Sequence, residues 1–185
     1  MDTFEAILTR HSISKVKPDP IPRVLLEKLL NAAVQAPNHH QLRPWRFVVL
    51  TGKSREALGE VIAQSLKKNN PEVPEAGLEK ERAKPLRAPV IIAVGVDRQI
   101  DQRVPEIENI CAVAAAVENL LLAAHAAGLG AMWRTGAAAL DPAVKKFLGF
   151  EPDQKLLSFV YIGYPDQEIP GTQRCSFDDR TVWMD

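Results

Sequence analysis

The stretch that decides the fold is ENLLLAAHAAGLGAMW, residues 118–133, the second half of a long apolar segment. Alanines and leucines surround the helix axis, so the pattern predicts a buried helix over residues 105–127 that is apolar on every side. Such a helix lies at the centre of a domain or is shared with a second subunit. Gly128 is typical of the residue that ends a helix. Within the helix, Glu118 needs a structural partner, and His125 is predicted to be a satisfied core histidine.

The segments on either side of this helix predict an α+β domain. Strands embedded among helices favour a layered sheet with helices on both faces. Two helices precede the first strand and no G-x-G-x-x-G follows a strand, which argues against a Rossmann domain. The predicted helices begin at Asp2 or Thr3, at Pro22, at Ser54 and at Asp141, and the predicted strands cover residues 46–51, 89–96, 131–136 and 156–164.

The chain is most simply one domain, residues 1–185, because its length allows a single sizeable core. Residues 68–85, KNNPEVPEAGLEKERAKP, are charged and interrupted by prolines. We interpret them as an exposed excursion and a candidate mobile lid. Residues 166–185 are interpreted as a C-terminal tail.

Composition excludes several classes of partner. Lysine and arginine balance aspartate and glutamate at 23 each, so neither nucleic acid nor an anionic membrane surface is expected. The apolar run over residues 110–127 is too polar for a membrane span, and the acidic N-terminus does not resemble a signal peptide. Two cysteines give no disulfide framework, which favours the cytoplasm. The four histidines have no metal-ligand spacing, and His39 and His40 would point to opposite faces of a strand.

Three polar segments are candidate ligand-binding sites. Residues 10–15, RHSISK, combine cations and hydroxyls suited to an anion, although a solvated helix end would look the same. In the loop before the first strand, Trp45 is interpreted as an anchor to the core. Residues 39–43 of that loop form either a donor set for a planar polar ligand or an ordinary surface loop. The glycines of residues 128–130 permit either close approach of a ligand to the backbone or a plain helix cap and turn.

Together these segments resemble the FMN-dependent nitroreductase family, and most closely its short single-domain YdjA-like branch. The family pattern R-R-S-x-R corresponds here to RHSIS at residues 10–14. The pattern "APS..N.QPW.F" corresponds to APNHHQLRPWRF at residues 36–47, and "NLLLAAHALGLG" to the central helix. The order and spacing of all three agree over roughly residues 4–165. The departures are His11 and Ser14 in place of arginines, with Lys15 next in the chain, and Gln41 and Arg43 in place of Asn and Gln.

The resemblance implies a nitroreductase-like α+β fold, with a mixed and mainly antiparallel sheet flanked by helices on both faces. It also implies a homodimer that binds FMN at the subunit interface. The residues that the resemblance assigns to FMN are Arg10, His11, Ser12, Gln35, His39, Trp133, Arg134 and Thr135, with Arg174 as a further candidate for the phosphate.

The resemblance also implies an activity. NADH or NADPH would reduce FMN, and a nitroaromatic, quinone or similar conjugated acceptor would then reoxidise it in a ping-pong reaction. No side chain is required as a catalytic acid or base, since solvent can supply the proton. The alternatives are another flavin reaction on the same fold, such as reductive dehalogenation or oxygen chemistry, and a flavin-binding or sensing protein without turnover.

Overall fold

The computed structural model describes residues 1–99, 101–167 and 176–184. Its centre is a four-stranded sheet in the order β1-β2-β4-β3. The strands are β1 (Trp45–Thr51), β2 (Val90–Val96), β3 (Gly130–Arg134) and β4 (Lys155–Gly163), and all three pairings between them are antiparallel. A parallel bridge joins Ser12 to Ala131. The predicted α+β fold and its mainly antiparallel sheet are therefore confirmed.

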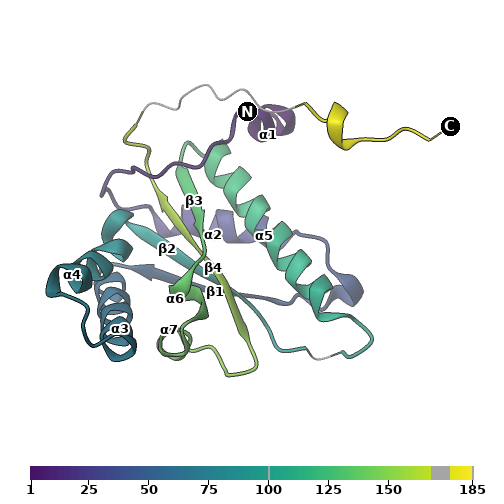
Figure 1. The fold of residues 1–185 in the computed structure, drawn as a ribbon. Helices are drawn as coiled ribbons and strands as arrows, with labels where there is room; N and C mark the ends of the chain where they lie inside the picture. Colours follow the sequence, from purple (N-terminus) through teal and green to yellow (C-terminus); the bar gives the residue numbers. More distant parts are fainter. Residues whose placement is uncertain (100, 168–175, 185) are drawn as a thin grey trace.

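Helices cover both faces of the sheet, as predicted (Figure 1). On one face, α2 (Arg23–Ala33) and α5 (Glu106–Ala126) pack on the sheet in one apolar cluster, which includes Trp45 at its edge. On the other face, α3 (Lys53–Asn69), α6 (Ala137–Leu140) and α7 (Pro142–Phe147) contribute to a second cluster. Every residue of β2 is buried, because this strand has neighbours on both sides and helices on both faces.

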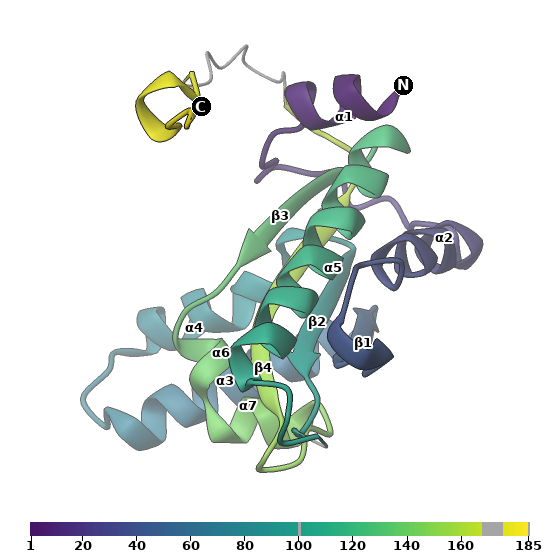
Figure 2. The same ribbon diagram turned by 90° about the vertical axis from the view of Figure 1, so that its right-hand side faces the viewer.

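The central helix predicted from the sequence is α5, and its ends follow the predicted signals. Pro105 precedes its first turn, and Gly128 adopts a positive φ of 74° just beyond its last turn. The Leu129 N–H donates to the Ala124 carbonyl at 2.9 Å, which closes the helix in a Schellman motif. Figure 2 shows α5 lying along the sheet, with α2 beside it. Its outer side carries Ile107, which is 62 % exposed in the single chain.

By length and composition alone, α5 is also the one described helix that would pass as a membrane span. Its buried face packs against the sheet and α2, and residues such as Val113, Ala116 and Leu120 are fully buried there. A core helix has the same composition as a span, so this criterion does not indicate a membrane protein.

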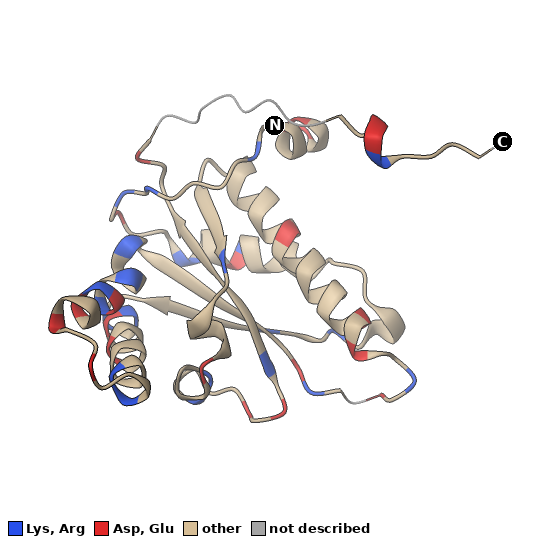
Figure 3. Cartoon of the chain, in the orientation of Figure 1, with Lys and Arg blue, Asp and Glu red and all other residues tan. Residues whose placement is uncertain are grey.

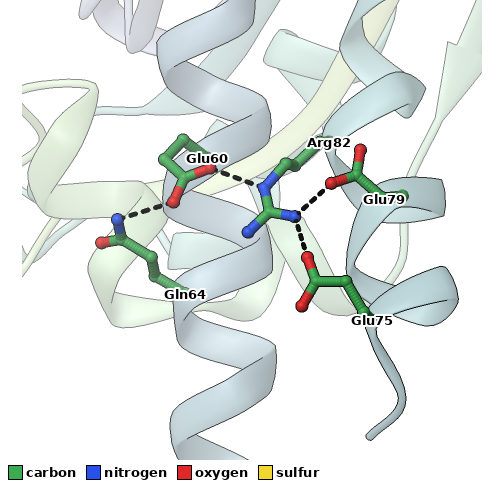
Figure 4. A network of polar contacts seen from close by, with 5 residues as sticks. All are labelled: Glu60, Gln64, Glu75, Glu79 and Arg82. Atoms are coloured by element: carbon green, nitrogen blue, oxygen red, sulfur yellow. Dashed lines mark hydrogen bonds and ion pairs between the residues drawn. The ribbon is translucent and has the colours of Figure 1, made fainter.

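Residues 68–85, interpreted as an exposed excursion, are mostly exposed, but they are largely helical and not an irregular loop. The segment contains α4 (Glu75–Ala83) and the 3-10 turn η2 (Lys84–Arg87), and it packs against α3. Leu78 and Pro85 are buried there. Arg82 ties the two helices together, because its guanidinium contacts Glu60 on α3 at 2.7 Å as well as acids on α4 (Figure 4). The charges and prolines of residues 68–85 suggested a loop, but they belong to a segment with a helix whose polar side faces solvent.

The two ends of the chain are attached differently. The short helix α1 (Thr3–Thr9) begins at Asp2, which caps it in a capping box with Glu5. The predicted tail is described only in part. Asp166 and Gln167 still hydrogen-bond to the Lys15 backbone, so the ordered chain continues past residue 165. Residues 176–184 contain the 3-10 turn η3 (Asp178–Arg180) and are exposed, whereas Arg174 lies outside the described residues.

Candidate functional site

The loop after α1 is joined directly to β3, which brings together two of the predicted segments. Ser12 forms a bridge with Ala131, and the Ile13 N–H donates to the Ala131 carbonyl at 3.0 Å. Gly130 is required at this contact, because a Cβ there would lie 2.7 Å from the Ile13 side chain. The predicted ligand residues Arg10, His11 and Ser12 therefore lie beside the start of the strand that ends at Arg134.

Arg10 and His125 link this loop to the last turns of α5. Arg10 Nε lies 3.3 Å from Glu118 Oε1, so Glu118 has the structural partner that the sequence required. His125 Nε2 lies 2.8 Å from the Thr9 hydroxyl. Partial burial lowers the pKa of His125, and the nearby positive charges of Arg10 and His11 lower it further. His125 is satisfied as predicted, but it is only partly buried, so its placement in the core is wrong.

The end of β3 carries buried polar groups without hydrogen-bond partners in the described part of the chain. Trp133 Nε1 and Arg134 Nε are both buried and have no hydrogen-bond partner among the described residues. The Arg134 guanidinium lies over the Tyr161 ring, 5.3 Å from its centroid. Leaving a buried donor unpaired costs about 1–3 kcal/mol. These nitrogens therefore suit a bound molecule that accepts hydrogen bonds next to the exposed Thr135.

The loop before β1 is conformationally strained. His40, Gln41 and Arg43 all have positive φ angles, of 49°, 53° and 51°. Each such non-glycine conformation costs about 1–3 kcal/mol and persists only where its surroundings hold it. Asn38 provides one such restraint, since its side-chain oxygen accepts the Arg43 N–H at 2.8 Å. Strain of this kind is typical of ligand-binding loops.

His39 is held by an acid from α5. Its Nδ1 lies 2.6 Å from Glu108 Oε2, in the first turns of that helix. His39 and His40 both lie in the 3-10 turn η1 (His39–Gln41), with their rings stacked 4.3 Å apart. No group of three potential metal ligands occurs in the described part of the chain.

Within one chain the predicted residues fall into two separate groups. Arg10 contacts Glu118, whereas His39 contacts Glu108, ten residues earlier on α5. At 1.5 Å per residue these two points are about 15 Å apart along the helix. Gln35 lies in neither group. It is exposed just after the end of α2, and its amide donates to the Asn31 carbonyl at 3.2 Å.

A cleft of about 520 Å³ opens beside the end of β3, on the side of the sheet that faces α3. Trp133, Arg134 and Thr135 lie on its wall, together with residues of α3, η2 and β4. Sequence reasoning did not find the cleft, because its walls come from segments far apart in the chain. Sequence reasoning also missed Glu108, because an acidic residue in the first turn of a helix is too common to indicate a functional site.

The model of the nitroreductase family matches residues 7–164. The chain belongs to the nitroreductase family. This match confirms the resemblance seen in the three motifs and makes the chain a nitroreductase-type oxidoreductase.

Relatives and solved structures agree with the family match. The chain is 32 % identical over 166 residues to YdjA of Escherichia coli, which has a provisional assignment as an NAD(P)H nitroreductase, and the alignment covers 89 % of each chain. It is 29 % identical over 203 residues to an NADH dehydrogenase of Thermus thermophilus, covering 99 % and 96 %. Its fold is similar to that of a nitroreductase-like protein from Bacillus cereus, with a TM-score of 0.86, 25 % identity and coverage of 100 % and 96 %.

Proposed function

We propose that this nitroreductase-family chain is an FMN-dependent NAD(P)H oxidoreductase that reduces a nitroaromatic, a quinone or a similar conjugated acceptor by a ping-pong reaction. The observation that carries the proposal is the bridge between Ser12 and Ala131, which joins the motif at residues 10–14 to the segment at residues 133–135. FMN, when bound, would accept a hydride from the nicotinamide and pass the electrons to the acceptor.

The residues present suit FMN. Arg10 and Ser12 offer a cation and a hydroxyl for a phosphate, as the family motif implies. Trp133 Nε1 and Arg134 Nε are buried donors without partners in the described chain. The polar edge of the flavin ring could accept hydrogen bonds from them. Glu118 already neutralises part of the Arg10 charge, so a phosphate would compete with or join this ion pair.

We propose further that the protein is a homodimer that pairs through α5 and works in the cytoplasm. The outer side of α5 has no other charged residue between Glu108 and Glu118, and Figure 3 shows how few charges it carries compared with α3 and α4. Ile107 on this side and Phe4 on α1 are largely exposed in the single chain. A two-fold axis across α5 would bring the His39 group of one subunit toward the Arg10 group of the other.

The first test is the absorbance spectrum of the purified protein, followed by release and identification of the bound cofactor. We expect about one FMN per subunit and oxidation of NADH or NADPH when a quinone is added. A colourless protein that takes up no added FMN contradicts the proposal. Bound FMN without NAD(P)H oxidation would instead favour a flavin-binding or sensing role.

The second test separates phosphate binding from general damage to the site. Arg10→Ala and Ser12→Ala should each weaken FMN binding about tenfold to a hundredfold, the usual effect of losing one charged hydrogen bond. Riboflavin lacks the phosphate, so its affinity should change far less. Fluorescence titration of both flavins into the apoprotein measures the difference. Equal losses for both flavins would show that Arg10 acts only through the fold and its ion pair with Glu118.

A further inference from the structure

The cleft beside β3 extends well beyond the predicted flavin segment. The rest of its wall combines an apolar surface with basic groups from α3, η2, β3 and β4. Figure 1 shows how these elements are arranged. Leu58, Ile62, Met132 and Phe159 provide the apolar part. A volume of about 520 Å³ falls within the usual range for small-molecule sites of about 300–1,000 Å³.

The charges in this cleft leave an excess of positive charge. Its two acids are engaged, since Glu81 pairs with Lys84, and Asp141 caps α7 by accepting the Ala143 N–H at 2.8 Å. Arg87 and Arg134 also line the cleft, and within the described chain neither forms an ion pair with a carboxylate. Two guanidinium groups in a partly apolar cleft attract an anion.

Tyr161 lines the same cleft as the two arginines. The Arg134 guanidinium lies over its ring, 5.3 Å from the centroid. Burial raises the pKa of the Tyr161 phenol above its ordinary value, which outweighs the opposing effect of Arg134 and Arg87. The phenol is therefore protonated at neutral pH and can donate a hydrogen bond to an anion beside it.

We propose that this cleft binds the anionic group of an aromatic acceptor, with Arg87, Arg134 and Tyr161 receiving a carboxylate and the apolar wall receiving the ring. The inference rests on the proposed function, because it names the class of acceptor that the enzyme reduces. It assigns acceptor specificity to Arg87, a residue outside the three sequence motifs.

The test uses the purified holoprotein and two matched probes, 4-nitrobenzoate and its neutral amide, 4-nitrobenzamide. Calorimetric titration without NAD(P)H measures binding independently of turnover. We expect the carboxylate to bind about tenfold or more tightly than the amide, as expected for a charged hydrogen bond. Arg87→Gln should remove this preference. Lys80→Gln, which removes an exposed cation of α4 outside the cleft lining, should retain it.

Turnover provides the second readout. In steady-state assays with NAD(P)H, the ratio of kcat/KM for the carboxylate to that for the amide should fall in Arg87→Gln and stay unchanged in Lys80→Gln. Circular dichroism checks that Arg87→Gln is folded. If the folded variant retains the carboxylate preference, or if the wild type has none, the inference is overturned while a yellow, NAD(P)H-oxidising protein still supports the proposed function.

Two further outcomes distinguish acceptor binding in the cleft from binding of the reductant, and from a failure of the proposed function. If Arg87→Gln changes only the KM for NADPH and not that for NADH, the cleft binds the 2′-phosphate of the reductant, and the acceptor proposal is wrong. If the protein binds no flavin yet prefers the carboxylate through Arg87, the proposed function fails, while the anion-binding role of the cleft stands.

Discussion

The helices α5 and α4 are held in place by different forces. In α5, residues such as Val113, Ala116 and Ala124 are fully buried against the sheet and α2. In α4, Leu78 is the one buried residue, and much of the attachment to α3 is polar. The first helix is stabilised by removal of apolar area from water, at about 25 cal/mol per Å². The second depends on close backbone approach and on the ion pairs of Arg82.

This difference has consequences for both stability and function. The helix α5 supplies Glu108 and Glu118, which hold the two groups of predicted ligand residues, so these groups share the rigidity of the core. The helix α4 leads into η2, whose Arg87 lines the cleft. We therefore expect the cleft wall to loosen more readily than the site beside α5, because exposed ion pairs contribute little individually.

The largest effect is expected in α5. Ala124 is fully buried, so Ala124→Glu places a charge without a partner in the core and should destabilise the fold by about 4 kcal/mol or more. Circular dichroism and urea unfolding measure this loss. The matched control is Cys111→Glu, at an exposed position of the same helix, which should keep the fold but weaken the proposed dimer in sedimentation experiments. A normally folded Ala124→Glu protein would contradict the central position of α5.

A smaller effect is expected where α3 meets α4. A Cβ added at Gly59 would lie 2.4 Å from the Arg82 carbonyl oxygen. Gly59→Ala should therefore destabilise the protein by about 1–3 kcal/mol, the range for overpacking, even though alanine favours a helix by about 1 kcal/mol over glycine. The control is Gly77→Ala, whose nearest contact is a Val73 side-chain methyl that can move. Urea unfolding should show a loss only for Gly59→Ala, and a stabilised Gly59→Ala protein would show that the helices can separate at little cost.

A still smaller, local effect is expected for Arg82→Gln. Hydrogen bonds and ion pairs with Glu75, Glu60 and Glu79 raise the pKa of Arg82 above its ordinary value. Its loss should speed hydrogen exchange in α4 and leave exchange in α5 unchanged. The effect should shrink at high salt, because screening weakens exposed pairs. Lys80→Gln is the control. Equal acceleration in both helices would mean that α4 and α5 unfold as one unit.

The smallest effect concerns pH and the last turn of α5. The pKa of His125 is lowered in the folded chain, so the unfolded chain takes up the proton first as pH falls. Stability should therefore decrease as pH drops through the unfolded value of about 6.5 and level off below the folded value. Urea unfolding of the wild type and His125→Gln between pH 8 and about 5 measures the difference. The same pH profile in both proteins would assign the change to other groups.

The sequence alone determined the parts of the molecule whose signals are local. The alanine and leucine pattern predicted α5, Gly128 predicted its end, and the apolar run at residues 89–96 predicted a strand. The motif at residues 10–14 and the stretch at residues 118–133 identified the family, which the family match confirmed. Such features are readable because burial and caps impose a period and a residue type at fixed positions.

Only the tertiary structure decided which distant polar groups meet. The strain at His40 and the pairing of His39 with Glu108 depend on α5 passing the loop before β1. The attachment of α4 through Arg82 depends on Gly59, which lets the backbones of α3 and α4 approach closely. The sequence pattern of residues 68–85 resembles a loop because most of its side chains face water. Ion pairs and clefts leave no period in the sequence, since each depends on the approach of segments that the core brings together.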